Sequence, residues 1–83
     1  MQLKINVTQA NIDAGRPRAA AQCPVALAIA ETLKLSPVFT LEEEWETLWG
    51  EKGGTLSLGA QRFIVCFDAG IPVEPFVFVT ELF

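Results

Sequence analysis

Histidine and tyrosine are both absent from this 83-residue chain. Histidine is the side chain that most often transfers protons near neutral pH, and it is also the commonest zinc ligand. Serine occurs only at positions 36 and 57, and neither has a histidine to act as its base. The sequence therefore excludes a hydrolase of the serine–histidine triad type, and we predict a non-catalytic protein without a metal or other cofactor.

Cysteine is scarce as well, because Cys23 and Cys66 are the only two and they lie far apart. Two cysteines are too few for a disulfide framework, and without a CxxC pair they predict neither a redox motif nor a structural zinc site. We expect both to be buried thiols. A phosphate-binding loop of the GxxxxGK type is also missing.

Basic residues and long apolar runs are both in short supply. Six scattered Lys and Arg stand against ten Asp and Glu, for a net charge of -4, whereas general nucleic-acid binding requires clustered positive charge. The longest apolar run, residues 24–30, is well short of the ~20 residues of a membrane helix. The N-terminal segment has a polar residue at every second position, unlike a signal peptide. We predict a cytoplasmic protein that associates neither with membranes nor generally with nucleic acid.

The chain has ample apolar content, since 51% of its residues are hydrophobic and only 19% are charged. Such a composition predicts a folded domain rather than a disordered tail. A domain of this length buries only about 60–65% of the surface of its unfolded chain, so its own core gives a modest stability margin. We therefore predict a homo-oligomer.

The first half of the chain reads as strand, short helix, loop and longer helix. Apolar residues alternate over residues 2–7, which is typical of a half-buried strand. Thr8 can cap a short helix over residues 9–14, with Ile12 as its inward anchor. After a loop over residues 15–22, Pro24 suits the first turn of a helix that runs to Lys34. That helix is apolar most of the way round, which predicts a covering surface on each side.

The second half reads as short strands around one helix. We predict strands over residues 38–41, 45–49, 55–58 and 76–82, a turn over 50–54, and a helix over 60–68. A helix over 42–49 is an open alternative. Both faces of the last strand are apolar, which predicts cover on each. The whole chain, 1–83, is predicted to be one α+β domain: a mainly antiparallel sheet of four to five strands with two main helices and a short N-terminal helical turn.

The candidate ligand-binding residues are arginines and tryptophans. Arg16 and Arg18 precede a helix start, where guanidinium and backbone N–H groups suit a phosphate or carboxylate; simple solvent exposure is the alternative. Arg62 adds a third positive charge if the helices lie side by side. Trp45 and Trp49 would share one face of a strand and stack a base or contact a partner, with core packing as the alternative.

The glutamates at 42, 43, 44 and 46 are close enough in sequence to bind a divalent cation or to act as acid and base. We favour a solvated edge that discourages sheet association. A carboxylate-only enzyme acting through Glu44 and Glu46 is the least favoured class of function.

The motifs IxVTxxxIDxG, CPVALAI and RFIxxFDAGIPVEPFxF resemble a group of small bacteriophage and prophage proteins. The likeness covers residues 3–33 and 61–79, and the central EEEWETLWGEKGG segment lies outside it. The resemblance implies a phage accessory protein in the host cytoplasm that counters host defence by binding. Two hypotheses follow. One is a sponge that sequesters a phosphate-bearing nucleotide signal of the cyclic nucleotide or cyclic ADP-ribose type; the other is an interaction module that inhibits or adapts a host protein through an acidic edge and an apolar strand.

Overall fold

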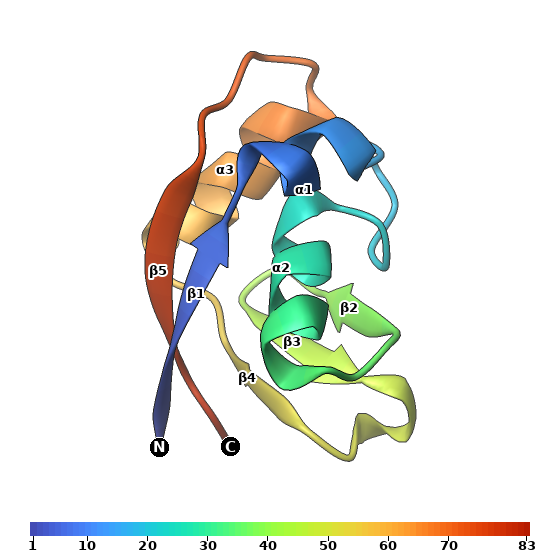
Figure 1. Cartoon of the computed structure of the whole chain (residues 1–83), viewed down its shortest axis with the longest axis vertical. Helices are drawn as coiled ribbons and strands as arrows, with labels where there is room; N and C mark the ends of the chain where they lie inside the picture. Colours follow the sequence, from blue (N-terminus) through green and yellow to red (C-terminus); the bar gives the residue numbers. More distant parts are fainter.

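The computed structural model describes residues 1–83 and contains three α-helices and five β-strands (Figure 1). Two strands form one antiparallel sheet in the order β1–β5, and three form a second in the order β2–β3–β4. The predicted α+β class is therefore confirmed. The strands differ from the prediction in that they divide between two sheets.

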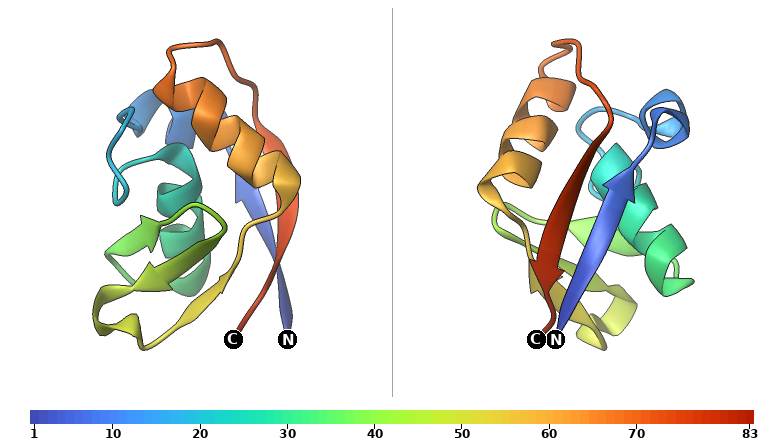
Figure 2. Two further views of the ribbon diagram at one scale, coloured as in Figure 1. Left: turned by 180° about the vertical axis from the view of Figure 1, so that it is seen from behind. Right: turned by 60° about the vertical axis from the view of Figure 1, so that its left-hand side comes forward.

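Strands β1 (Gln2–Val7) and β5 (Phe76–Glu81) form a two-stranded antiparallel ribbon in which Ile5 lies opposite Phe78. Alternation along both strands places Ile5, Val7, Phe78 and Thr80 in the core. Val77 and Val79 point outward and are 51% and 49% exposed. This chain covers only the inner face of the last strand, because Val77 and Val79 stay half exposed, and cover of the outer face by another subunit stays a prediction. The two termini lie side by side at one end of the molecule (Figures 1 and 2).

Helix α1 (Gln9–Ala14) starts at the predicted cap, Thr8, and is held by a buried asparagine. Asn11 is only 2% exposed. Its side-chain oxygen accepts the Thr8 backbone N–H at 2.9 Å, and its amide nitrogen donates to Glu31 on the next helix at 2.7 Å. Ile12 is only partly buried. Asn11 can be buried because its polar groups all have hydrogen-bond partners. The short helix is therefore anchored by Asn11 as well as by the predicted Ile12.

Helix α2 (Pro24–Leu33) forms the centre of the core, with Val25, Ala28 and Ile29 fully buried. It begins with proline in its first turn, as predicted, and its last residue is Leu33, followed by the cap residue Lys34 in the left-handed conformation. It packs against α1, α3 and the strands β1 and β2. Other parts of the chain thus supply cover for this strongly apolar helix.

The three-stranded sheet comprises β2 (Val38–Thr40), β3 (Glu44–Thr47) and β4 (Gly53–Thr55). Two predicted boundaries are wrong. Strand β3 stops at Thr47, where a short 3-10 turn, η1 (Leu48–Gly50), begins. Strand β4 starts at Gly53 rather than at position 55, because the tight connection brings the glycine pair opposite Trp45 and Glu46. The helical alternative for residues 42–49 is excluded.

Helix α3 (Leu58–Asp68) begins two residues earlier than predicted because Ser57 caps it, accepting the Ala60 N–H. Its inner face contacts β5 through aromatic rings. The ring centroid of Phe63 lies 4.8 Å from that of Phe76, which in turn lies 5.7 Å from that of Phe78. This aromatic row fixes the helix against the ribbon.

The two sheets meet at Trp45, which is completely buried. Its indole N–H donates to Thr80 Oγ1 of β5 at 2.8 Å, and the Thr80 hydroxyl donates to the Thr55 carbonyl of β4 at 2.7 Å. An isolated bridge between Gly54 and Leu82 continues this junction. One tryptophan and one threonine therefore tie together strands that are distant in sequence.

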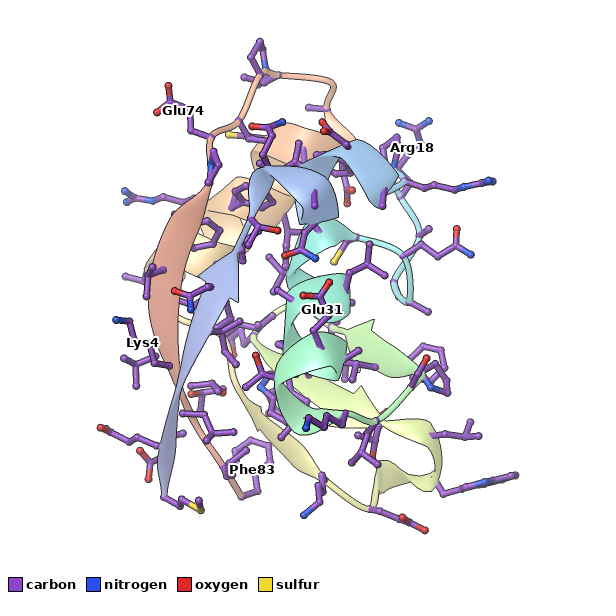
Figure 3. All side chains as sticks on the ribbon, in the orientation of Figure 1. Lys4, Arg18, Glu31, Glu74 and Phe83 are labelled. Carbon is purple, nitrogen blue, oxygen red and sulfur yellow. The ribbon has the colours of Figure 1, made fainter.

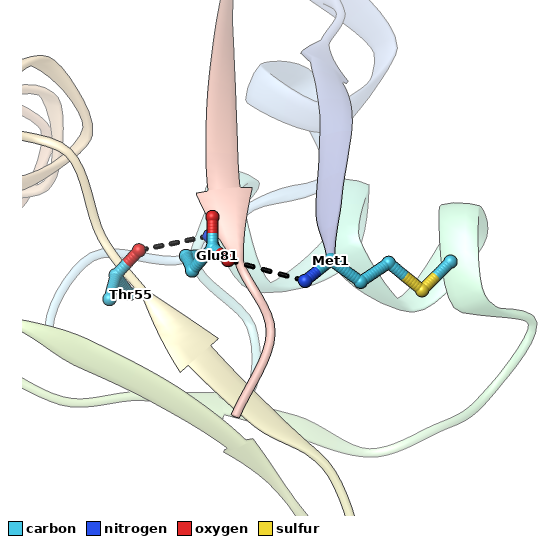
Figure 4. Close-up of polar contacts among 3 residues, drawn as sticks. All are labelled: Met1, Thr55 and Glu81. Atoms are coloured by element: carbon cyan, nitrogen blue, oxygen red, sulfur yellow. Dashed lines mark hydrogen bonds and ion pairs between the residues drawn. The ribbon is translucent and has the colours of Figure 1, made fainter.

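The chain end contributes the structure's one ion pair, between the Met1 amino group and Glu81 at 3.2 Å (Figure 4). The Glu81 backbone N–H also donates to Thr55 Oγ1 at 3.0 Å. The hydrogen bond from the amino terminus, with a smaller contribution from Gln2, lowers the pKa of the Glu81 carboxyl below its ordinary value of 4.5. The ionised carboxylate is thus the form that the folded state favours.

We expect Glu81→Gln to lose a pH-dependent part of its stability. Because the folded-state pKa is lowered, the contribution of Glu81 is present above pH 4.5 and is lost as the pH falls through the folded-state value. Urea unfolding at pH 7 and at acid pH measures this: the gap between wild type and variant should be small at pH 7 and should shrink as the pH falls below 4.5. Glu74→Gln, which makes no such pair, is the control. A gap that widens toward pH 3 would contradict the assignment.

Candidate functional site

A cleft of about 640 Å³ lies between three segments: the loop before α2, the end of β2 with the turn that follows it, and one side of α3. Figure 2 shows these segments together in its left view. Its apolar lining comes from Ala19, Ala20, Leu41, Ile64 and Val65. Its charged lining comes from Arg18, Glu42, Glu43 and Asp68. It is the largest hollow in the molecule and the most promising candidate site.

Arg18 forms one wall of the cleft and is held against the end of α3. Its backbone N–H donates to Asp68 Oδ1 at 2.8 Å, and its guanidinium donates to the Asp68 carbonyl oxygen at 2.9 Å. A cation at the carbonyl end of a helix is favourable, because it complements the unpaired C=O groups there. The guanidinium is thus engaged in fixing the loop to α3. Figure 3 shows Arg18 on the opposite side of the molecule from Lys4 and Glu74.

The base of the cleft is a small polar contact between Cys23 and Thr40. Their Sγ and Oγ1 atoms are 3.2 Å apart, and the Cys23 sulfur also accepts the Ala26 N–H at 3.3 Å. Pro24, Val25 and Ala26 are buried. At the helix start proposed as a phosphate site beside Arg16 and Arg18, the first residues are therefore buried and the Ala26 N–H already has a partner in the Cys23 sulfur.

The cleft is acidic on balance. Three acidic residues, Glu42, Glu43 and Asp68, line it together with one basic residue, Arg18. The Glu42 and Glu43 side chains form no ion pair, since the structure's one ion pair is elsewhere. Such a lining favours a cation on an apolar stem over a phosphate, which three carboxylates repel.

The acidity extends over the whole three-stranded sheet and its turns, residues 38–55, which we call the acidic lobe. It contains five glutamates (42, 43, 44, 46 and 51) and a single lysine (52), and so carries a charge of -4. The rest of the chain contains five acidic and five basic residues, and so is neutral. The entire net charge of the protein therefore lies in this lobe.

The structure does not bring the predicted ligand-binding residues together. Arg18 lines the cleft, whereas Arg16 is exposed outside it, and Arg62 lines a separate shallow hollow on α3 beside Leu58 and Cys66. Trp45 is buried and Trp49 is 87% exposed. The prediction that the tryptophans share a strand face is wrong, because the strand ends at Thr47 and Trp49 turns outward at a φ of 67°.

The sequence did not predict Asp68 as a site residue, and it did not predict that Glu42 and Glu43 line a cleft. Only the topology that brings the β2–β3 turn beside the end of α3 places them together.

Among the acidic and cysteine side chains, no group of three or more is arranged to hold a metal ion. Cys23 is buried as predicted, whereas Cys66 is only partly buried. None of the helices is long and apolar enough to cross a membrane.

No family model matches the chain, no curated protein matches its sequence, and no solved structure matches its fold. The resemblance to bacteriophage proteins therefore stays a prediction, and function is argued from the site alone.

Proposed function

We propose that this protein is a non-catalytic interaction module that binds a basic, amphipathic segment of a partner protein through its acidic lobe and the adjoining cleft. The observation that carries the proposal is the concentration of the whole net charge in residues 38–55, beside the largest cleft. Complementary charge speeds encounter and selects the partner, whereas apolar contacts supply most of the affinity.

The cleft lining fits this partner chemically. Leu41, Ile64 and Val65 offer apolar contact to the methylene stem of a lysine or arginine side chain, or to a neighbouring leucine. Glu42 and Glu43 accept the cationic end of such a side chain. From the sequence resemblance we propose further that the chain is a phage accessory protein and that the partner is a host protein in the cytoplasm.

Sequestration of a phosphate-bearing nucleotide is the second candidate function. Its support is Arg18, the predicted ligand residue that lines the cleft. Two observations weigh against it: the Arg18 guanidinium already donates to the Asp68 backbone carbonyl, and three acidic residues line the same cleft. Self-association is a separate proposal, supported by the half-exposed Val77 and Val79 on the outer face of the ribbon.

We expect a fluorescent 12-residue peptide of alternating leucine and lysine to bind in an anisotropy titration, and a leucine–glutamate peptide not to bind. The double variant Glu42→Gln/Glu43→Gln should weaken binding about three- to tenfold, since each exposed charge contact contributes roughly 0.2–1 kcal/mol. The loss should shrink as salt is raised, because these charges are exposed to solvent.

The matched control is Asp13→Asn/Glu74→Gln, which removes two exposed carboxylates outside the lobe. It should leave peptide affinity nearly unchanged. If both double variants weaken peptide binding equally, the effect is due to net charge alone and the proposed site is wrong. Calorimetric binding of ADP-ribose or a cyclic dinucleotide, with no peptide binding, would favour nucleotide sequestration instead.

A further inference from the structure

The loop between β3 and β4 is closed by a polar clamp. The Thr47 backbone N–H donates to the Lys52 carbonyl at 2.9 Å, and the Lys52 N–H donates to Thr47 Oγ1 at 3.0 Å. The four residues between them, 48–51, therefore project from a fixed base at the end of the acidic lobe. A loop fixed in this way loses little conformational freedom on binding.

Trp49 stands at the tip of this loop and is the most exposed large apolar side chain in the protein. Its backbone is left-handed, with φ 67°, a conformation that is unfavourable for a bulky residue. Leu48 beside it is about half exposed. The indole is exposed, so packing in the core of its own chain does not offset the cost of this backbone conformation. Exceptional backbone of this kind clusters at functional sites.

The charge around the tip indicates what covers it. Glu46 lies next to Gly50, Glu51 follows it, and Lys52 is the only basic residue of the acidic lobe. An anionic membrane surface would be repelled. A protein surface with an apolar pocket and a rim of lysine or arginine is complementary both to the indole and to the carboxylates around it.

We propose that Trp49, supported by Leu48, is the anchor of the interface: it enters an apolar pocket with a basic rim on the partner protein. This inference rests on the proposed function and deepens it, because it names the residue that supplies most of the affinity at the tip. Tryptophan is among the residues most enriched at such anchoring positions.

A defined chemical mimic of that pocket tests the proposal in the full-length chain. The probe is heptakis-amino-β-cyclodextrin, an apolar cavity with a cationic rim, titrated by tryptophan fluorescence. Because Trp45 is buried, Trp49 supplies the response. The reference is the affinity of N-acetyltryptophanamide for the same probe. We expect the wild-type protein to bind the probe about tenfold more tightly than this reference. In the variant Glu46→Gln/Glu51→Gln the affinity should fall to the reference level. Affinity at the reference level in wild type would overturn the proposal.

Photo-crosslinking in cells tests the same anchor with the biological partner. A benzoylphenylalanine placed at position 49 should form a discrete protein adduct whose crosslinked peptide contains both apolar and basic residues. The control places the same group at Leu58, an exposed position on α3. Adducts to lipid, to a second copy of the chain, or no adduct beyond the Leu58 control would each overturn the proposal.

The two proposals fail separately. If the leucine–lysine peptide binds at Glu42 and Glu43 while the cyclodextrin titration stays at the reference level, the acidic lobe is the interface and Trp49 is not its anchor. If the peptide does not bind at all, the proposed function itself falls.

Discussion

Replacing Trp45 with alanine should lower the free energy of unfolding by about 3–5 kcal/mol, the range for removing a buried tryptophan. The side chain is completely buried where the two sheets meet, and its N–H donates to Thr80 at 2.8 Å. The substitution removes a large apolar surface, leaves a cavity and deprives Thr80 of a donor. Because small domains are stable by only about 5–15 kcal/mol, a large part of the total would be lost. Urea unfolding followed by far-ultraviolet circular dichroism measures the change.

The second tryptophan provides the control for the first. Trp49→Ala removes the same side chain from a position that is 87% exposed, so we expect its midpoint to shift little. Trp45→Phe should fall between the two, since it keeps most of the apolar contact but loses the hydrogen bond to Thr80. Similar losses for Trp45→Ala and Trp49→Ala would contradict the placement of Trp45 at the junction.

Gly54→Ala should destabilise the protein by about 2–3 kcal/mol, as expected for overpacking in a tight core. A Cβ at this position would lie 2.7 Å from both Thr80 Oγ1 and Trp45 Nε1, and 2.8 Å from the Glu81 carbonyl oxygen. The added methyl group would therefore push apart the two hydrogen-bonded side chains that join the sheets. Thermal unfolding should show a correspondingly lower midpoint.

Gly59→Ala is the matched glycine control. A Cβ there meets only Ser57 Oγ, at 3.8 Å, and the position lies in the first turn of α3. Alanine is the better helix former, so we expect a gain of about 0.5 kcal/mol rather than a loss. Equal destabilisation by both glycine substitutions would show that the close packing at Gly54 is not the cause.

Much of the fold follows from local sequence signals. Period-2 alternation identified β1, Thr8 identified the start of α1, and Pro24 identified the start of α2. These signals depend on neighbouring residues alone, which is why they hold without knowledge of the tertiary fold. The boundaries around residues 48–58 could not be predicted in this way. There the clamp between Thr47 and Lys52 and the junction at Gly54 decide where strands end, and both depend on partners across the sheet.

The candidate site was harder to predict than the fold. Arg18 was identified as a candidate by its charge, but its hydrogen bonds to Asp68 join residues fifty positions apart. The even spacing of Trp45 and Trp49 indicated one face, whereas the chain places one side chain in the core and the other in solvent. Spacing predicts a shared face only while the strand continues. The glutamate run was visible, but its position beside an apolar cleft required the fold.

The most direct test of the central claim is to map peptide binding residue by residue with ¹H–¹⁵N correlation spectra of the labelled protein. On addition of the leucine–lysine peptide, we predict shift changes concentrated in the cleft segments and the acidic lobe, residues 18–23, 38–55 and 61–68. Changes centred on the outer face of the β1–β5 ribbon or along α1 and α2 would contradict the claim. So would an unchanged spectrum with the peptide together with cleft shifts on addition of ADP-ribose.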